Sequence, residues 1–226
     1  MVRIGSLELN KSIVAAIGKN PVESAANAKK LGADLLELRI DLLDDYSEAV
    51  SLLQEIKKTG LPVIITNRMK QEGGAWENSE DERIGLLLSL MSLADAVDIE
   101  LCAKDRDCVV KEARKSGKTV IISTHDFKKT PPYDAMKSVL DKSFAAGADI
   151  AKLAVMPGSF DDVLRLLDVT LHAKGAVCTI AMGDIGKHSR VIAQVYGSVM
   201  TYGSVDTATA PGQLRVDELK TILELI

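Results

Sequence analysis

The chain has 226 residues, of which 46% are hydrophobic and 27% are charged, as in an ordinary globular protein built from one large domain or two small ones. Its net charge of −4 leaves no basic footprint for nucleic acid or an anionic membrane, and no apolar run approaches the roughly 20 residues of a membrane span. Three cysteines without a paired metal-binding spacing, and an N-terminus without the apolar core of a signal peptide, predict a cytoplasmic protein with reduced thiols.

One pattern repeats along the chain: a short apolar run, polar residues at its end, and then an amphipathic helix that ends near a glycine. The apolar runs predict eight strands, at residues 12–18, 35–41, 62–68, 96–101, 119–126, 147–157, 176–183 and 199–205. The intervening segments predict helices at 22–31, 47–58, from 79 onward, up to 116, up to 146, from 159 to near 175, at about 187–196, and from 216 to the end. Ser79 with Glu82 matches a capping box, and Ser159 is a candidate helix cap.

Strands that alternate with helices pair in parallel through right-handed crossovers, and eight such units close into a (β/α)8 barrel. We therefore predict one (β/α)8 barrel domain over residues 1–226. A doubly wound open sheet is the alternative, and it ranks lower because the first strand–helix turn, GKNP at residues 18–21, lacks a G-x-G-x-x-G fingerprint. The residues before Ser12 predict an extra strand or hairpin at the bottom of the barrel.

The sixth predicted strand, GADIAKLAVMP at residues 147–157, is apolar on both faces except for Asp149 and Lys152. A lysine is almost never fully buried without a partner, and a neutral amine in a dry pocket is a nucleophile that forms Schiff bases with carbonyl compounds. The alternative is a lysine that extends to solvent from a strand end. Lys152 shares its strand face with Ile150, Ala154 and Met156.

Polar residues stand near the ends of almost every other strand, and in a (β/α)8 barrel these ends carry the active site. They are Glu37, Arg39 and Asp41, which alternate and so share one face, then Arg68 with Glu72, Asp98 with Glu100, His125 with Asp126, Met182 with Arg190, and residues 207–213. Each has a plainer explanation. Glu37 and Arg39 can form a structural ion pair, a lone histidine is more often a hydrogen-bonded core residue, and Asp98, Glu100 and Asp126 can be salt-bridge partners.

A buried lysine beside a histidine on the next strand predicts carbonyl chemistry. The amine forms an iminium that serves as an electron sink, and His125 moves a proton next to that carbon. Arg68 and Arg190 can neutralise a carboxylate, while Glu37, Glu72 and Gln213 can bind hydroxyls or orient the histidine. The implied substrate is a hydroxylated keto acid, and the reaction is a β-elimination or an aldol cleavage. No metal is required, since no ligand pair has a recognised spacing.

Six motifs together resemble type I 3-dehydroquinate dehydratase over almost the whole chain and in the order of that family. They are ELRID, NR followed by QEGG, STHDF, GADIAKLAVMP, AMGDIGKHSR and ATAPGQ. The resemblance implies a (β/α)8 barrel of the shikimate pathway, which serves aromatic amino acid biosynthesis. It implies removal of water from 3-dehydroquinate to give 3-dehydroshikimate, through a lysine Schiff base and without metal or cofactor. It also implies a homodimer.

Carried over by position, Lys152 resembles the Schiff-base lysine, His125 the general acid and base, and Glu72 the carboxylate that positions the histidine. The remaining matched positions bind substrate in the family, with Arg190 on the carboxylate, and residues 209–213 resemble a lid. These positions are Glu37, Arg39, Arg68, Arg190, Thr209 and Gln213.

Three positions depart from the pattern of the enteric bacterial members. Thr209 and Ala15 stand where those have serine, and Asn67 stands where they have phenylalanine. Two other readings of the chain remain. A class I aldolase should carry a phosphate site in the loops after strands seven and eight. A barrel that only binds a keto acid or a protein partner should form no borohydride-trappable adduct on Lys152.

Overall fold

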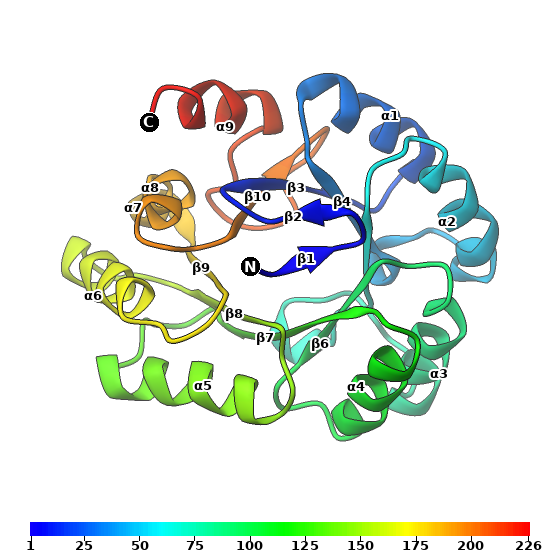
Figure 1. Ribbon diagram of the computed structural model, residues 1–226, viewed down its shortest axis with the longest axis horizontal. Helices are drawn as coiled ribbons and strands as arrows, with labels where there is room; N and C mark the ends of the chain where they lie inside the picture. The colour runs from blue at the N-terminus through cyan, green and yellow to red at the C-terminus, as the bar shows by residue number, and fades with distance from the viewer.

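Eight parallel strands form a nearly closed barrel in the computed structural model, which describes residues 1–226 (Figure 1). In chain order they are β3 (Ser12–Ile17), β4 (Leu35–Arg39), β5 (Val63–Thr66), β6 (Ala96–Glu100), β7 (Thr119–Asp126), β8 (Ile150–Val155), β9 (Val177–Ala181) and β10 (Met200–Ser204). Consecutive strands from β3 to β9 pair in parallel, and β10 pairs with β3. The predicted (β/α)8 barrel is therefore confirmed, and the open doubly wound sheet is excluded.

The seam of the barrel lies between β9 and β10, which share no regular ladder. Val199 N donates to Val177 O at 2.8 Å, and Thr179 N donates to the Ser198 hydroxyl at 3.3 Å. Both bonds lie at the beginning of the two strands. Further along the seam, Arg190 Nη1 donates to Tyr202 O of β10 at 3.4 Å.

Helices surround the barrel and cover its outer surface (Figure 1). They are α1 (Pro21–Leu31), α2 (Ala49–Lys57), α3 (Glu80–Leu90), α4 (Arg106–Lys115), α5 (Tyr133–Ala145), α6 (Phe160–Leu171), α7 (Gly183–Gly186), α8 (Ser189–Val195) and α9 (Val216–Leu223). The predicted caps are confirmed: Ser79 and Glu82 form a capping box on α3, and Ser159 accepts from Asp162 N at the start of α6. None of these helices combines the length and the hydrophobicity that a membrane span requires.

The second and third strands are shorter than the sequence predicted. β4 ends at Arg39, and Asp41 lies in a 3-10 turn, η1 (Ile40–Leu42). β5 ends at Thr66, so Arg68 lies in the loop before the turn η3 (Lys70–Glu72). A further 3-10 turn, η2 (Tyr46–Glu48), precedes α2. Each predicted run ends in polar residues that lie beyond the last ladder bond, where the chain leaves the barrel wall.

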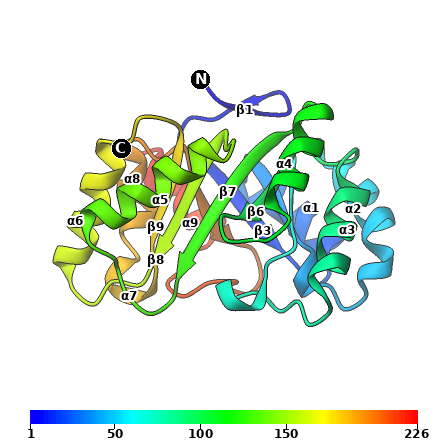
Figure 2. The ribbon, with the colours of Figure 1, turned by 90° about the horizontal axis from the view of Figure 1, so that it is seen from below.

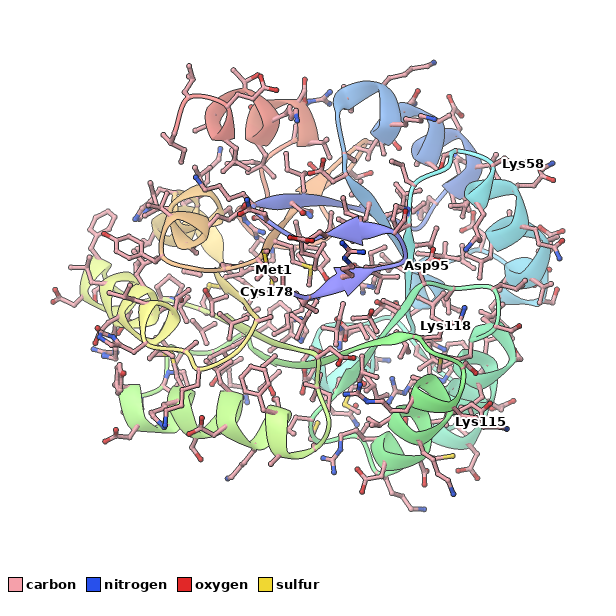
Figure 3. The ribbon with its side chains drawn as sticks, in the orientation of Figure 1. Met1, Lys58, Asp95, Lys115, Lys118 and Cys178 are labelled. Carbon is pink, nitrogen blue, oxygen red and sulfur yellow. The ribbon has the colours of Figure 1, made fainter.

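An antiparallel hairpin of β1 (Arg3–Ile4) and β2 (Leu7–Glu8) closes the bottom of the barrel, as the sequence predicted (Figure 2). Ile4 and Leu9 are buried in the same cluster as Ile150 and Ala154 of the barrel interior. Figure 3 shows Cys178 near the middle of the barrel behind the hairpin. Apolar side chains fill the barrel interior at this end, and a pocket lies at the opposite end, where the strands finish.

Alternate residues of β8 face opposite sides of the barrel wall. Ile150 and Ala154 pack in the interior cluster, whereas Ala151, Leu153 and Val155 pack in the cluster beneath α5 and α6. Lys152 has the parity of the first pair, so its side chain points into the barrel. The sequence predicted this parity correctly.

Candidate active site

All nine residues that the sequence placed in the site line one pocket at the open end of the barrel. They are Glu37, Arg39, Arg68, Glu72, His125, Lys152, Arg190, Thr209 and Gln213. Figure 2 shows this end opposite the hairpin, where the loops that follow β5 and β10 lie. The pocket is therefore built by strand ends that are far apart in sequence, as in other barrels of this class.

The Lys152 side chain is buried, with 4% of the residue exposed, so it does not extend to solvent. Its Nζ lies 3.1 Å from Asp98 Oδ2 and 3.7 Å from Glu37 Oε1. The ring of Tyr202 lies against the same atom, with its centroid 4.0 Å away. Two carboxylates and an aromatic face therefore hold the amine in a fixed position inside the barrel.

Arg68 is the centre of a buried ion-pair network beneath the pocket. Its guanidinium donates to Asp98 at 2.7 Å, to Glu100 at 2.9 Å and to the Ser123 hydroxyl at 2.6 Å. Burial by itself would raise the pKa of Asp98, but the positive charges of Arg68 and Lys152 hold that pKa below its usual range. The sequence suggested Arg68 as a carboxylate-binding residue, whereas its charge is already matched by two protein carboxylates.

His125 and Glu72 form a hydrogen-bonded pair. Glu72 Oε2 lies 2.8 Å from the ring Nδ1 of His125 and also accepts from the backbone N of His125 at 2.9 Å. Burial and the nearby charges of Arg68 and Lys152 hold the pKa of His125 well below its usual value, so the ring is neutral at neutral pH. With the proton on Nδ1 directed at the carboxylate, Nε2 has a free lone pair and can act as a base.

Burial raises the pKa of Glu72 to about 7, although Arg68 and a hydrogen bond from Cys102 both act in the opposite direction. The Cys102 thiol donates to Glu72 Oε1 at 3.3 Å, which is the carboxylate oxygen that does not face His125. The pair therefore titrates close to neutral pH, where an acid–base catalyst is most effective.

Arg190 differs from every other buried cation of the site because no carboxylate pairs with it. Its Nε and Nη2 donate to the carbonyl oxygens of Gly212 and Pro211, each at 2.8 Å, and Nη1 donates to Tyr202 O at 3.4 Å. Burial without an acidic partner lowers its pKa to about 10. A buried guanidinium held only by backbone carbonyls is suited to an anionic ligand, for which a carboxylate is the natural choice.

The loop after β10 lies over the pocket. Hydrogen bonds within the loop and close packing against Gly183 hold it there. Thr209 donates to Gln213 Oε1 from both its backbone N and its hydroxyl, at 2.7 and 3.1 Å. Gly212 has a φ of 67° and lies so close to Gly183 that a Cβ would clash with the Gly183 carbonyl oxygen, so only glycine fits there. This loop places Thr209 and Gln213 in the pocket wall.

Arg39 and Asp41 form a bidentate ion pair at 2.9 and 2.7 Å beside the pocket. Asp41 also accepts from the backbone N of Arg68 at 3.1 Å and of Ala75 at 3.1 Å, so it shapes the loop that carries Glu72. Burial opposes ionisation of Asp41, but the Arg39 pair outweighs it and lowers the pKa. Glu37 Oε1 accepts from Thr66 at 2.8 Å, which orients the carboxylate toward Lys152.

Comparison with known proteins gives the same picture as the geometry. The model of the type I 3-dehydroquinase family matches residues 12–226. The chain belongs to this family. It is 54% identical to the 3-dehydroquinate dehydratase of Methanosarcina barkeri and 51% identical to that of Methanococcoides burtonii, and both alignments cover 100% of each chain.

Solved structures of the family share the fold. The type I 3-dehydroquinate dehydratase from Clostridium difficile, solved with covalently modified comenic acid, has a TM-score of 0.91 and 33% identity, covering 99% of this chain and 96% of that one. The 3-dehydroquinate dehydratase from Geobacillus kaustophilus has a TM-score of 0.90 and 28% identity, covering 98% and 92%.

Sequence reasoning missed three residues of this dehydroquinase site. Asp98 was weighed only as a salt-bridge partner, yet it is the carboxylate nearest to Lys152. Cys102 was interpreted only as a reduced thiol and Tyr202 was not considered, although Cys102 lies two residues after the end of β6 and Tyr202 shares the inward parity of β10. Both positions were open to the same strand-end argument that identified the others.

The three departures from the enteric pattern have different surroundings. Ala15 is buried in the cluster between the barrel and its helices, so it does not face the pocket. The Asn67 side chain is buried without a hydrogen-bond partner. Only Thr209 lines the pocket, and there its hydroxyl takes part in the bond to Gln213.

Proposed function

We propose that this protein is a 3-dehydroquinate dehydratase, a hydro-lyase that removes water from 3-dehydroquinate to give 3-dehydroshikimate in the shikimate pathway. Family membership and the names of its full-length relatives support this activity. The observation that carries the proposal is the combination within one pocket of a buried amine, a neutral histidine and a buried arginine without an acidic partner.

In the proposed mechanism, the amine of Lys152 attacks the ketone of the substrate and releases water to form an iminium. His125 then removes a proton from the neighbouring carbon, and the electrons of that C–H bond move toward the positively charged nitrogen. Expulsion of the β-hydroxyl follows, with His125 returning a proton to the departing oxygen. Hydrolysis of the product iminium frees Lys152. Every step uses groups of this chain, and the proposal includes no cofactor or metal.

Arg190 is proposed to bind the substrate carboxylate and Glu72 to hold the histidine in its basic tautomer. Glu37, Arg39, Arg68, Thr209 and Gln213 are proposed to bind or surround the hydroxylated ring. The loop that carries Thr209 and Gln213 would exclude water while the iminium exists. We further propose that the enzyme is cytoplasmic and that it works as a homodimer. Light scattering of the purified protein would test the dimer.

Trapping with borohydride tests the reaction and the nucleophile together. Incubation of the protein with 3-dehydroquinate and borohydride should give an adduct on Lys152 in peptide mass spectrometry, with ultraviolet absorption of the conjugated product in the untrapped reaction. Lys152→Met, which keeps the volume of the side chain, should form no adduct and lose on the order of 10⁴-fold or more in turnover.

The His125→Ala variant should still form the lysine adduct, at a lower rate, while turnover stalls, because proton transfer at the neighbouring carbon and at the departing hydroxyl requires the imidazole. Product formation without an adduct would keep the dehydratase and reject the lysine mechanism. If wild-type protein gave neither signal, the class I aldolase and the non-catalytic barrel would replace the proposal.

A further inference from the structure

Tyr202 has a hydroxyl that the proposed mechanism does not use. The residue lies in β10 and points into the barrel, with 5% of its surface exposed. Its hydroxyl oxygen is buried and has no hydrogen-bond partner. Buried hydroxyls are normally hydrogen-bonded, so one left without a partner at the pocket wall requires an explanation.

The hydroxyl lies among the charged groups that surround Lys152. Burial raises the pKa of Tyr202 well above its ordinary value, and the carboxylates of Glu37 and Asp98 add to this effect. The phenol is therefore protonated throughout the working pH range and is available as a donor. Its ring contacts Lys152 Nζ, and both residues line the same pocket.

The carboxylate oxygens nearest to Lys152 hold other donors, and none accepts from the Tyr202 hydroxyl. Asp98 Oδ1 accepts from Arg68 and Ser123, and Asp98 Oδ2 accepts from Lys152. Glu37 Oε1 accepts from Thr66. The acceptor that the phenol lacks is thus one that a ligand can bring.

We propose that the Tyr202 hydroxyl donates a hydrogen bond to the oxygen of the carbonyl group that Lys152 attacks. This inference rests on the proposed function, since it concerns the first step of that reaction. The donor would act on the oxygen as it gains negative charge, in the manner of an oxyanion hole. Tyr202 keeps its own proton in every step.

The proton balance of this step closes with the groups present. The ammonium of Lys152 gives one proton to His125, and the freed electron pair forms the C–N bond while the C–O π pair moves to oxygen. That oxygen takes the proton from His125 and a second proton from the nitrogen, and it leaves as water. The nitrogen keeps its third proton in the iminium.

The Tyr202→Phe variant tests this role because it removes only the hydroxyl and keeps the ring against Lys152. The rate of formation of the borohydride-trappable adduct in a single turnover should fall by about 10-fold to 100-fold. The melting temperature should be unchanged or higher, because a buried hydroxyl without a partner is lost. Tyr196→Phe, at an exposed position after α8, is the matched control and should behave as wild type.

Three outcomes would overturn the proposed role of the Tyr202 hydroxyl. An unchanged rate in Tyr202→Phe, with wild-type protein active, overturns the inference alone. A slower rate accompanied by a lower melting temperature also overturns it, because the hydroxyl would then support the fold. If wild-type protein forms neither adduct nor product, the proposed function fails and the inference fails with it.

Discussion

The buried arginines on the two sides of the pocket have different hydrogen-bond partners. On the side of β5 and β6, Arg68 is matched by Asp98 and Glu100, and Arg83 adds a further bond to Glu100 at 2.9 Å. On the side of β9 and β10, Arg190 contacts only the carbonyl oxygens of Tyr202, Pro211 and Gly212. Both arginines are almost fully buried, so exposure does not distinguish them.

The difference separates a positioning role from a binding role. A buried cation paired with carboxylates is already neutralised, and it fixes the groups around it. A buried cation paired only with backbone dipoles keeps a field that an anion can neutralise. The structure therefore favours Arg190 over Arg68 as the residue that meets a substrate carboxylate. Arg68 holds Asp98, and Asp98 in turn holds Lys152.

Substituting methionine at each arginine should separate the two roles most clearly. Arg68→Met removes one of the two cationic partners of each buried carboxylate, Asp98 and Glu100, and we expect a loss of about 3–5 kcal/mol in unfolding free energy. Arg190→Met leaves only neutral carbonyls, so it should remain folded while kcat/KM falls on the order of 10²-fold to 10³-fold, chiefly through KM. Urea denaturation and steady-state kinetics measure the two effects. Equal destabilisation of both variants would contradict the distinction.

The Glu72→Gln variant tests a buried carboxylate whose ionisation lowers the unfolding free energy. Its folded pKa of about 7 lies above the unfolded value of roughly 4.3, so the folded state binds the proton more tightly. The wild-type unfolding free energy should therefore fall as pH rises from about 4 to 7, and the variant should be more stable than wild type at pH 8 by up to about 3 kcal/mol.

The activity of Glu72→Gln should fall, although its unfolding free energy at pH 8 rises. Wild-type kcat/KM should decline below about pH 7 as Glu72 becomes protonated, and the variant should lose this acid limb together with a factor on the order of 10² in rate. Thermal unfolding at pH 5 and pH 8, with a pH–rate profile, checks both parts. A variant less stable than wild type at pH 8 would refute the assignment.

The smallest expected effect concerns the Cys102 thiol. Its hydrogen bond favours the ionised form of Glu72, so Cys102→Ala should raise the pKa of that carboxylate and shift the acid limb of kcat/KM to higher pH. At pH 7 the loss should be about 2-fold to 5-fold. Cys102→Ser keeps a donor and should restore the wild-type profile. An identical shift in both variants would show that sulfur packing, rather than the hydrogen bond, matters.

Much of the architecture could be predicted without the structure, because hydrophobic periodicity and cap residues are local. All eight barrel strands, the Ser79 cap and the N-terminal hairpin were found in this way. The errors lie at strand ends, as at Asp41 and Arg68, where an apolar run does not show how many ladder bonds the neighbouring strands can supply.

The nine candidate residues were also found from type, parity and family resemblance, and the structure brings them into one pocket. Their individual contacts were not accessible in this way. Lys152 and Asp98 are 54 positions apart, and Arg68 and Ser123 are 55 apart. Which carboxylate lies against which cation depends on the curvature of the barrel, and no spacing in the sequence encodes it.

Local sequence patterns established the repeating strand–helix units, the inward parity of a lysine within an apolar strand and the polar residues at the strand ends, because each depends on neighbours only a few positions away. Only the tertiary structure decided that Arg68 is neutralised while Arg190 is not, that Cys102 supports Glu72, and that the Tyr202 hydroxyl has no partner. Charge pairing and pKa depend on distance and burial in three dimensions, and the closure of the barrel fixes both.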